Sequence, residues 1–140
     1  MVQAGAVPFV MREGSLQFAL VSSRSRRGWV IPKGCIEPGE SSAEAAEREA
    51  WEEAGVRGRL IPQIAGMYEY PRGRNLARVQ VYLLEVRQVV EEWPERRERD
   101  RRWADPLDAV RLAADGQLSA LLSLVPRWLG FEPRALRTTA

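Results

Sequence analysis

Hydrophobic residues near the N-terminus fall into two short runs separated by polar residues. Residues 4–12 and 16–23 each have the length and apolar content of a strand. The sequence Glu13-Gly14-Ser15 between them is typical of a tight turn, so the pattern predicts a β-hairpin. After a polar loop, the run Trp29-Val30-Ile31 predicts a brief strand that ends at Pro32, which has no N–H to donate.

The next segment predicts a helix that begins after Ser41. Glu44 follows three residues later and completes a capping box, and Gly55 stands where a left-handed C-terminal cap is expected. Helical spacing puts four alanines on one face, namely Ala43, Ala46, Ala50 and Ala54. A different sector of the helix, near Ala45, carries the carboxylates of Glu49, Glu52 and Glu53. We expect the alanines to pack on a sheet and the carboxylates to point into a cleft.

Two longer apolar segments follow this helix. Residues 57–70 and 76–87 predict two long strands, joined by a turn at 71–75. Within the second strand, alternation puts Val79, Val81 and Leu83, and by extension Glu85, on the face opposite Gln80, Tyr82 and Leu84.

The C-terminal third predicts short elements. Residues 91–101 have the composition of a charged loop, and Arg102-Trp103 predicts a short strand. Asp105-Pro106 is a helix start, with an apolar side made by Leu107, Val110, Leu112 and Ala113. A second helix begins with residues 117–122 and ends or kinks at Pro126, and we expect a loose tail after about residue 133. The element order indicates a single α/β or α+β domain over residues 1–140.

Composition excludes several classes of function. The chain has 140 residues, 45% hydrophobic and 29% charged, which is typical of an ordinary globular domain. It has no histidine, which excludes serine triads, Cys-His pairs and imidazole-based zinc sites, so acid–base chemistry falls to carboxylates or metal-bound water. The single Cys35 excludes an internal disulfide, and we interpret it as a small residue that fills a loop.

Charge and hydropathy limit the partners. A net charge of +2 is too small for a general polyanion binder, and we expect neither nucleic acid nor membrane as a partner. No apolar run approaches the roughly 20 residues that span a bilayer, and the N-terminus lacks a signal-peptide pattern, so we expect a cytoplasmic protein. The oligomeric state, monomer or homodimer, is left open.

The crowded carboxylates of Glu49, Glu52 and Glu53 indicate a metal. Like charges on one helix side repel one another unless a cation joins them. Hard cations such as Mg²⁺, or Mn²⁺, take oxygen ligands and commonly share a few carboxylates with substrate phosphates. The segment therefore predicts a metal-dependent site for a phosphorylated substrate.

Residues 34–56 resemble the box of the Nudix (MutT-like) hydrolase family, G-x5-E-x7-R-E-U-x-E-E-x-G-U with U apolar. Every fixed position matches, at Gly34, Glu40, Arg48, Glu49, Glu52, Glu53, Gly55 and Val56, with Ala50 as the other apolar position. Three outer segments, 22–24, 29–34 and 101–103, are similar to the diphosphoinositol and diadenosine polyphosphate branch. The resemblance implies an α/β/α sandwich with a mixed sheet, in which the box forms a loop–helix–loop.

The resemblance also implies roles for the box residues. Glu49, Glu52 and Glu53 are expected to bind the metal, as is the backbone carbonyl of Lys33. Arg48 is expected to orient or neutralise a ligand carboxylate, and Glu40 to position the loop or bind a second metal through water. The general base is Glu53 in our first interpretation, and the candidates outside the box are Glu69, Glu92 and Glu95.

Basic residues before the box predict phosphate contacts. The chain has twenty arginines and one lysine, Lys33, which suggests that this lysine stands there for its chemistry. The expected substrate-binding residues are Ser22, Ser23, Arg24, Arg26, Lys33 and Arg101, with Arg102 as an alternative to Arg101. The alternative for each arginine is a solvated surface position, which is also the usual meaning of the mixed charges at 96–102. Trp29, Tyr68 and Tyr70 would either stack on a base or lie in the core.

Together these features predict a hydrolase of pyrophosphate bonds. The expected substrates are dinucleoside polyphosphates, such as diadenosine tetraphosphate or hexaphosphate, or a diphosphoinositol polyphosphate. Nucleoside triphosphates, ADP-ribose and RNA 5′ ends are alternatives within the family. A module that senses a nucleotide without cleaving it is the alternative from another class.

Overall fold

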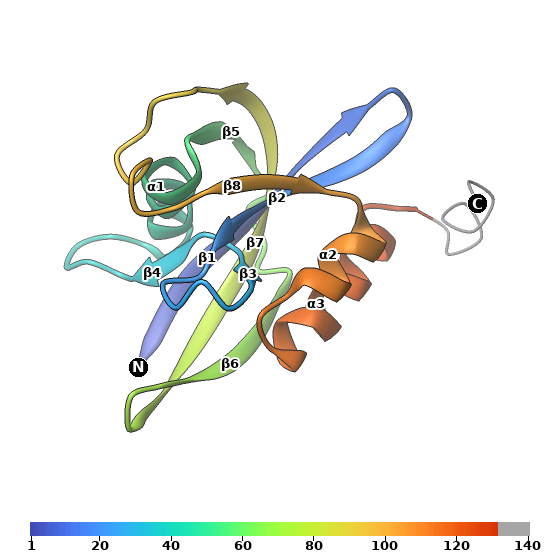
Figure 1. The fold of residues 1–140 in the computed structure, drawn as a ribbon. Helices are drawn as coiled ribbons and strands as arrows, with labels where there is room; N and C mark the ends of the chain where they lie inside the picture. The colour runs from blue at the N-terminus through green and yellow to red at the C-terminus, as the bar shows by residue number, and fades with distance from the viewer. Residues whose placement is uncertain (132–140) are drawn as a thin grey trace.

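The computed structural model describes residues 1–131 as one mixed sheet between two helical layers. The strands are β1 (Val2–Arg12), β2 (Ser15–Ser22), β3 (Trp29–Val30), β4 (Lys33–Cys35), β5 (Val56–Leu60), β6 (Gly66–Arg72), β7 (Asn75–Val89) and β8 (Arg101–Ala104). The helices are α1 (Ser42–Ala54), α2 (Pro106–Leu112) and α3 (Gly116–Trp128). Helix α1 lies on one side of the sheet and α2 and α3 on the other (Figure 1), so the predicted layered fold is confirmed.

Strand β1 occupies the centre of the sheet and changes its partner along its length. It runs parallel to β7 from Val2 to Phe9. On its other edge it pairs with β4 at residues 3–5 and with β2 at residues 9–12, both antiparallel. The chain that leaves β2 therefore returns to β1 at Lys33, beside the start of the box. This divergence of β2 from β4 creates the place where the site forms.

The predicted N-terminal hairpin is confirmed. Strands β1 and β2 pair up to Arg12 and Ser15, and the turn consists of Glu13 and Gly14, which both have positive φ values of 53° and 76°. Strand β3 ends before Pro32, as predicted, but β4 was not predicted, because its three residues have no apolar pattern.

The single strand predicted over 57–70 is wrong. Two strands, β5 and β6, occupy this stretch, and both pair antiparallel with β7, which is 15 residues long. Residues 61–65 cross between them, where Pro62 cannot donate a ladder hydrogen bond. The turn predicted at 71–75 is also shorter, since Arg72 pairs with Asn75 and leaves only Gly73 and Arg74 between them.

Both caps of α1 have the predicted form. Ser41 and Glu44 make the capping box, and Gly55 has a φ of 67° in the left-handed region. Ala46, Ala50 and Ala54 are fully buried as expected, but Ala45 is fully buried in place of Ala43. The buried face of the helix is therefore rotated towards the carboxylates, and it includes Glu49 and Glu53, which are 7% and 4% exposed.

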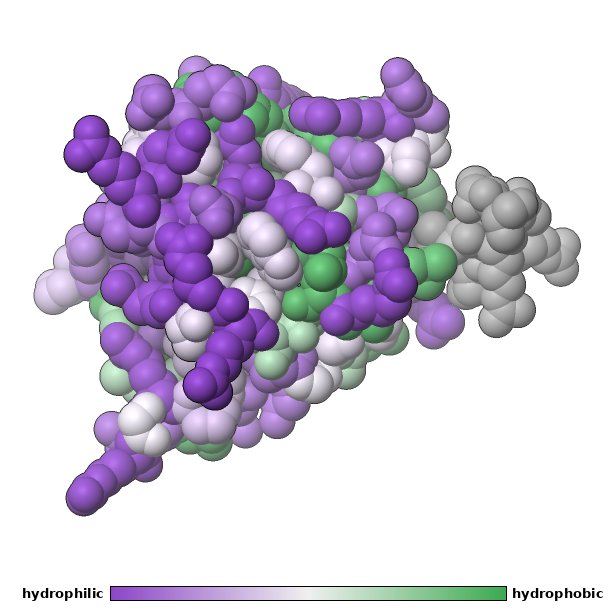
Figure 2. Space-filling model, in the orientation of Figure 1, coloured by the Kyte–Doolittle hydropathy of each residue, from purple (hydrophilic) through white to green (hydrophobic). Residues whose placement is uncertain are grey.

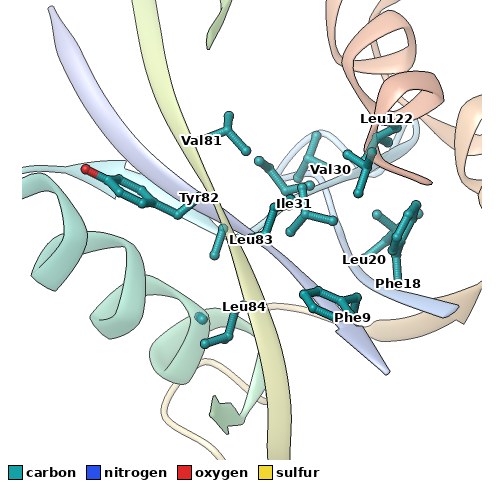
Figure 3. Close-up of a cluster of buried hydrophobic side chains, with 14 of the residues drawn as sticks. Phe9, Phe18, Leu20, Val30, Ile31, Val81, Tyr82, Leu83, Leu84 and Leu122 are labelled. Carbon is teal, nitrogen blue, oxygen red and sulfur yellow. The ribbon is translucent and has the colours of Figure 1, made fainter. Parts of the chain in front are cut away.

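Buried side chains of the core lie on both faces of β7. Val81 and Leu83 point towards the layer of α3, whereas Tyr82 points towards α1 (Figure 3). The tyrosine hydroxyl makes a hydrogen bond with the Ser42 side chain at the start of α1. The predicted alternation along this strand is correct, but both of its faces are buried, because a helical layer covers each side.

The C-terminal helices agree with the prediction except in detail. Asp105 and Asp115 cap α2 and α3. Leu107, predicted on the apolar side of α2, is exposed, and Pro106 and Ala109 are the buried residues instead. Helix α3 continues through Pro126 and ends two residues later. The tail predicted after residue 133 lies outside the described residues, and none of the described helices is long and apolar enough to cross a membrane.

A bulge in β5 gives a test of the sheet. The register between β5 and β7 shifts between Arg57 and Gly58, and a Cβ atom added at Gly58 would overlap the carbonyl oxygen of Glu85. We expect Gly58→Ala to lower the free energy of unfolding by about 1–3 kcal/mol in urea denaturation, because the backbone must move. Gly116→Ala is the matched control, since nothing lies within 4 Å of its added Cβ atom. Equal stability of the two variants would contradict this register.

Candidate functional site

The guanidinium group of Arg48 organises the acidic residues of the box. It donates two hydrogen bonds to Glu40, at 2.8 and 2.9 Å, in a bidentate pair. It also donates to Glu49 at 3.0 Å, to Glu52 at 3.3 Å and to the carbonyl oxygen of Cys35 at 3.0 Å. The hydrogen bonds from Arg48 lower the pKa of Glu40 to about 2. Glu40 thus holds the loop and the arginine in place, which is the first of its two predicted roles.

Glu49 lies against the backbone of the loop that precedes the helix. A Cβ atom added at Gly34 would overlap the Glu49 carboxylate, so only glycine leaves room for it there. Burial raises the pKa of Glu49, and the charge of Arg48 partly opposes this effect. A buried carboxylate pressed against the backbone of a loop is suited to share a cation with a carbonyl oxygen of that loop.

Glu53 is the most enclosed of the three predicted metal ligands. One of its oxygens accepts a hydrogen bond from the backbone N–H of Lys33 at 3.0 Å, and the other accepts one from Arg99 at 3.1 Å. Burial raises the pKa of Glu53, and the nearby charge of Arg99 opposes the rise. This residue therefore ties three segments together, namely α1, β4 and the loop before β8.

Glu52 and the three outside candidates for the base occupy different environments. Glu52 keeps 35% of its side chain exposed and, in the part of the chain that the structure describes, forms an ion pair with Arg48 alone. Glu95 pairs with Arg99, and its backbone N–H donates to the carbonyl oxygen of Glu52. Glu69 pairs with Arg78 on the neighbouring strand, and Glu92 is an exposed loop residue. Of the outside candidates, Glu95 is thus the one in contact with the box helix.

The residues of the box fit a hard divalent cation. Within residues 1–131, no group of three or more His, Cys, Asp or Glu side chains is arranged to hold a metal as it stands. Arg48 draws Glu49 and Glu52 towards itself, and Arg99 draws Glu53. The donors are nevertheless all oxygens, they lie on adjacent turns of one helix, and Gly34 has no side chain to fill the place that the Glu49 carboxylate occupies. Binding of a cation would require these carboxylates to turn away from the arginines.

A cleft of about 440 Å³ adjoins these carboxylates at Glu53. Four cationic side chains line it, from Arg24, Lys33, Arg72 and Arg99. Two carboxylates line it as well, from Glu53 and Asp115. Burial lowers the pKa of Lys33, whose ammonium group lies 4.8 Å from the centre of the Tyr70 ring. An excess of positive charge in a partly enclosed space is suited to a chain of phosphates.

The structure brings some of the predicted substrate-binding residues to this cleft and leaves others away from it. Ser23, Arg24 and Lys33 line it. Ser22 is buried beside it, where its hydroxyl accepts from the backbone of Asp100. Arg26 has a φ of 58° and forms an exposed ion pair with Asp100 at 2.8 Å. Ser22 and Arg26 therefore shape the loop and do not line the cleft.

The structure places Arg101 outside the cleft, contrary to its predicted phosphate contact. Its guanidinium group donates to the carbonyl oxygens of Ala54 and Val90 at 2.9 and 2.8 Å and lies 4.5 Å from the Trp93 ring. It thus closes the C-terminal end of α1, where carbonyl groups have no helical partner. Arg102 is exposed, with its guanidinium 5.8 Å from the Trp29 ring. Neither arginine lines the cleft.

The three aromatic candidates divide between core and cleft. Tyr68 is 3% exposed, and Trp29 packs against the core. Tyr70 lines the cleft, and its hydroxyl donates to the Gln3 side chain at 2.8 Å.

Sequence patterns did not reveal several residues that line the cleft. Arg99 stands in a run of mixed charges that resembles a solvated surface, yet it is 6% exposed and bonded to Glu53. Gln3, Arg72 and Asp115 come from segments far apart in the chain. No local signal marks any of them, since only the folded sheet brings them together.

Comparison with known proteins agrees with the resemblance seen in the box. A family model described as NUDIX domain matches residues 2–124. Nudix hydrolase 16, mitochondrial, of Arabidopsis thaliana is 36% identical over 127 residues, which cover 76% of this chain and 69% of that protein. Diphosphoinositol polyphosphate phosphohydrolase NUDT4B of Homo sapiens is 38% identical over 93 residues, 65% of this chain and 50% of that protein. The chain spans about half the length of several such relatives.

Solved structures show the same fold. A binary complex of C. elegans Ap4A hydrolase superposes with a TM-score of 0.73 at 25% identity and covers 92% of this chain and 97% of its own. The NUDIX domain of Shewanella oneidensis NrtR, complexed with ADP ribose, has a TM-score of 0.67 at 15% identity, with 92% and 88% of the two chains covered. At that identity the second likeness shows the fold alone. The match over most of the chain, the complete box and the shared fold establish that this chain belongs to the Nudix family.

Proposed function

We propose that this chain hydrolyses a pyrophosphate bond in a phosphate-rich small molecule with the help of a divalent cation, Mg²⁺ or Mn²⁺. One observation carries the proposal: Glu53 belongs at once to the carboxylate group of the box and to the cationic cleft. A substrate whose phosphates occupy the cleft would therefore reach the carboxylates. The established family membership supports the same reaction.

The proposed site has residues that would bind the cation and residues that would bind the phosphates. A bound divalent cation would neutralise charge on the phosphates and lower the pKa of a water molecule. Glu49, Glu52, Glu53 and the carbonyl of Lys33 supply oxygen ligands for it, and Arg48 fixes Glu49 and Glu52. Arg24, Lys33 and Arg99 hold the phosphate oxygens.

The geometry favours Glu52 over Glu53 as the proton acceptor. Both oxygens of Glu53 already accept hydrogen bonds, from Lys33 and Arg99. Glu52 is partly exposed, and within residues 1–131 its carboxylate accepts only from Arg48, at the longer distance of 3.3 Å. A base must be free to receive a proton from water, so Glu52 replaces the first candidate from the sequence.

The favoured substrates are dinucleoside polyphosphates and diphosphoinositol polyphosphates. Relatives named for diphosphoinositol polyphosphates and for Ap4A support this choice. Four cations against two carboxylates in the cleft favour several phosphates in a row. Nucleoside triphosphates, ADP-ribose and RNA 5′ ends share the same chemistry and remain the alternatives within the family. A sensor that binds without cleavage is disfavoured, because this chain keeps every carboxylate of the box.

The deciding experiment measures phosphate release, coupled to a phosphatase, from a panel of these substrates with Mg²⁺, Mn²⁺ or EDTA. We expect metal-dependent turnover by the wild type. Glu52→Gln should lower it by at least about 10²-fold without loss of folding, because it removes a ligand or base and no core contact. Glu47→Gln, an exposed change on the same helix, is the control and should keep full activity. Near-normal turnover by Glu52→Gln would overturn its assigned role, and silence over the whole panel would favour a sensor.

Gly34→Ala tests the cation site without relying on activity. An added Cβ atom would displace the Glu49 carboxylate, so the affinity for Mg²⁺ should fall by about 10-fold or more. The measurement is the rise of the melting temperature with Mg²⁺ concentration, which reports binding to the folded state. Gly116→Ala is again the control. An unchanged Mg²⁺ response in Gly34→Ala would mean that Glu49 does not bind the cation.

Alanine variants of Arg24, Lys33 and Arg101 distinguish a phosphate contact from a structural role. Arg24→Ala and Lys33→Ala should raise KM by about 2- to 5-fold, more for diadenosine hexaphosphate than for the tetraphosphate, because each removes one of the four cationic side chains of a cleft that is partly open to solvent. Arg101→Ala should instead lower the free energy of unfolding by about 1–3 kcal/mol, since two carbonyl oxygens lose their donor. A KM effect of Arg101→Ala that grows with phosphate number would restore it as a substrate contact.

A further inference from the structure

One carboxylate in the cationic cleft has no role in the proposed reaction. Asp115 lines the cleft together with Arg24, Lys33 and Arg72, but it comes from the opposite helical layer to Glu53 (Figure 1). Whereas Glu53 pairs with Arg99, no basic side chain within residues 1–131 lies within 4.0 Å of the Asp115 carboxylate. The charge of Asp115 favours the protonated form of Lys33, but a carboxylate that lines the cleft still repels phosphate, so its presence there calls for another explanation.

The structure fixes Asp115 in position from two sides. One of its oxygens, Oδ1, accepts the hydrogen bond from Leu118 N–H at 2.8 Å that caps α3. The residue before it is held by the hydrogen bond from Ala114 N–H to the Trp29 carbonyl at 2.9 Å. A Cβ atom added at Gly28 would lie 2.9 Å from the Cα atom of Ala114, so the loop packs tightly there. With Oδ1 engaged in the cap, Oδ2 is the oxygen left to face the half-buried cleft.

Asp115 offers an acceptor oxygen in a cleft whose other charged lining residues, apart from Glu53, are cations. Val30 and Ala114 add apolar lining to the cleft. A phosphorylated inositol carries phosphates around its whole ring and would place a phosphate against Asp115. A nucleoside instead presents N–H or O–H donors and an apolar ring face, which suit these lining residues.

We propose that Asp115 accepts a hydrogen bond from the nucleoside end of the substrate and so selects nucleoside polyphosphates over phosphorylated inositols. This inference rests on the proposed function and narrows its substrate class. The donor is either a ribose hydroxyl or an amino group of the base. Asp115 is thus a specificity-determining residue, and the phosphates extend from it past Lys33 towards the carboxylates of the box.

The competing explanation is that Asp115 only caps α3. Asp105 provides the matched control, because it caps α2 in the same way, with a 2.8 Å hydrogen bond from Asp108 N–H, and is exposed outside the cleft. Asparagine caps helices as well as aspartate does. In Asp115→Asn the oxygen remains in the cap and the amide N–H₂ faces the cleft, so the variant keeps the fold and turns an acceptor into a donor.

The test compares two non-hydrolysable probes by calorimetric titration with Mg²⁺ present. α,β-Methylene ADP carries a nucleoside, and methylenediphosphonate has the same bridged phosphorus atoms without it. For Asp115→Asn we expect the Kd of α,β-methylene ADP to rise by about 10-fold or more, as for a lost hydrogen bond to a charged group, with methylenediphosphonate unchanged or bound slightly more tightly. Asp105→Asn should leave both Kd values unchanged. No binding of α,β-methylene ADP by the wild type, an unchanged Kd in Asp115→Asn, or equal weakening of both probes would each overturn the inference.

Analogues of the nucleoside probe identify the donor. If it is a ribose hydroxyl, the 2′-deoxy analogue binds the wild type as weakly as α,β-methylene ADP binds Asp115→Asn. If it is the adenine amino group, the inosine analogue, which presents an oxygen there, binds Asp115→Asn more tightly than the adenosine analogue does. The assignment would be contradicted if Asp115→Asn still preferred the ribose probe to its 2′-deoxy analogue, and the adenosine probe to its inosine analogue, as strongly as the wild type does.

Hydrolysis assays on the same proteins separate this inference from the proposed function. A wild type that binds α,β-methylene ADP through Asp115 but releases no phosphate from any substrate retains the inference and refutes the hydrolase. If the wild type and Asp115→Asn hydrolyse a diphosphoinositol polyphosphate and diadenosine tetraphosphate in the same ratio of rates, the hydrolase is retained and the inference is refuted.

Discussion

The site depends on a single arginine placed among four acidic groups. Glu49, Glu52 and Glu53 lie within five residues of one helix, where their charges repel one another. Arg48 contacts two of them and at the same time binds Glu40 and the carbonyl of Cys35. The same guanidinium group thus reduces the repulsion between the carboxylates of the helix and attaches the preceding loop to it. Because the loop carries Gly34 and Lys33, this attachment also decides where the backbone meets Glu49.

A second arginine connects this helix to the substrate cleft. Arg99 reaches Glu53 and the carbonyl of Ser22, and it is buried with them. A buried ion pair is costly to break, because either partner alone would leave an uncompensated charge. The loop before β8 is therefore held against the box and against the end of β2. In the view of Figure 2 the surface around α1 is largely hydrophilic, and hydrophobic residues are visible towards α2 and α3.

Sequence patterns predicted the ends of elements best where these depend on hydrogen bonds between nearby residues. Ser41, Glu44 and Gly55 fixed the ends of α1, and Glu13-Gly14 fixed the turn of the hairpin, because caps and tight turns involve only nearby residues. The strand predicted over 57–70 failed for the opposite reason, since its division depends on the long partner β7. Leu107 failed as well, because the packing of α2 on the sheet, and not its own pattern, decides which side is buried.

The sequence by itself determined the box, the order of the elements and the identity of the acidic residues, because these follow from spacing along one helix and one loop. Only the tertiary structure decided which charges meet. It moved Arg101 from the expected phosphate contact to the end of α1, and it buried Arg99 and brought Asp115 into the cleft. An arginine or an aspartate has the same local pattern whether it is solvated, structural or part of a site. Its role depends on the partners that distant strands bring within hydrogen-bonding distance, which no local spacing encodes.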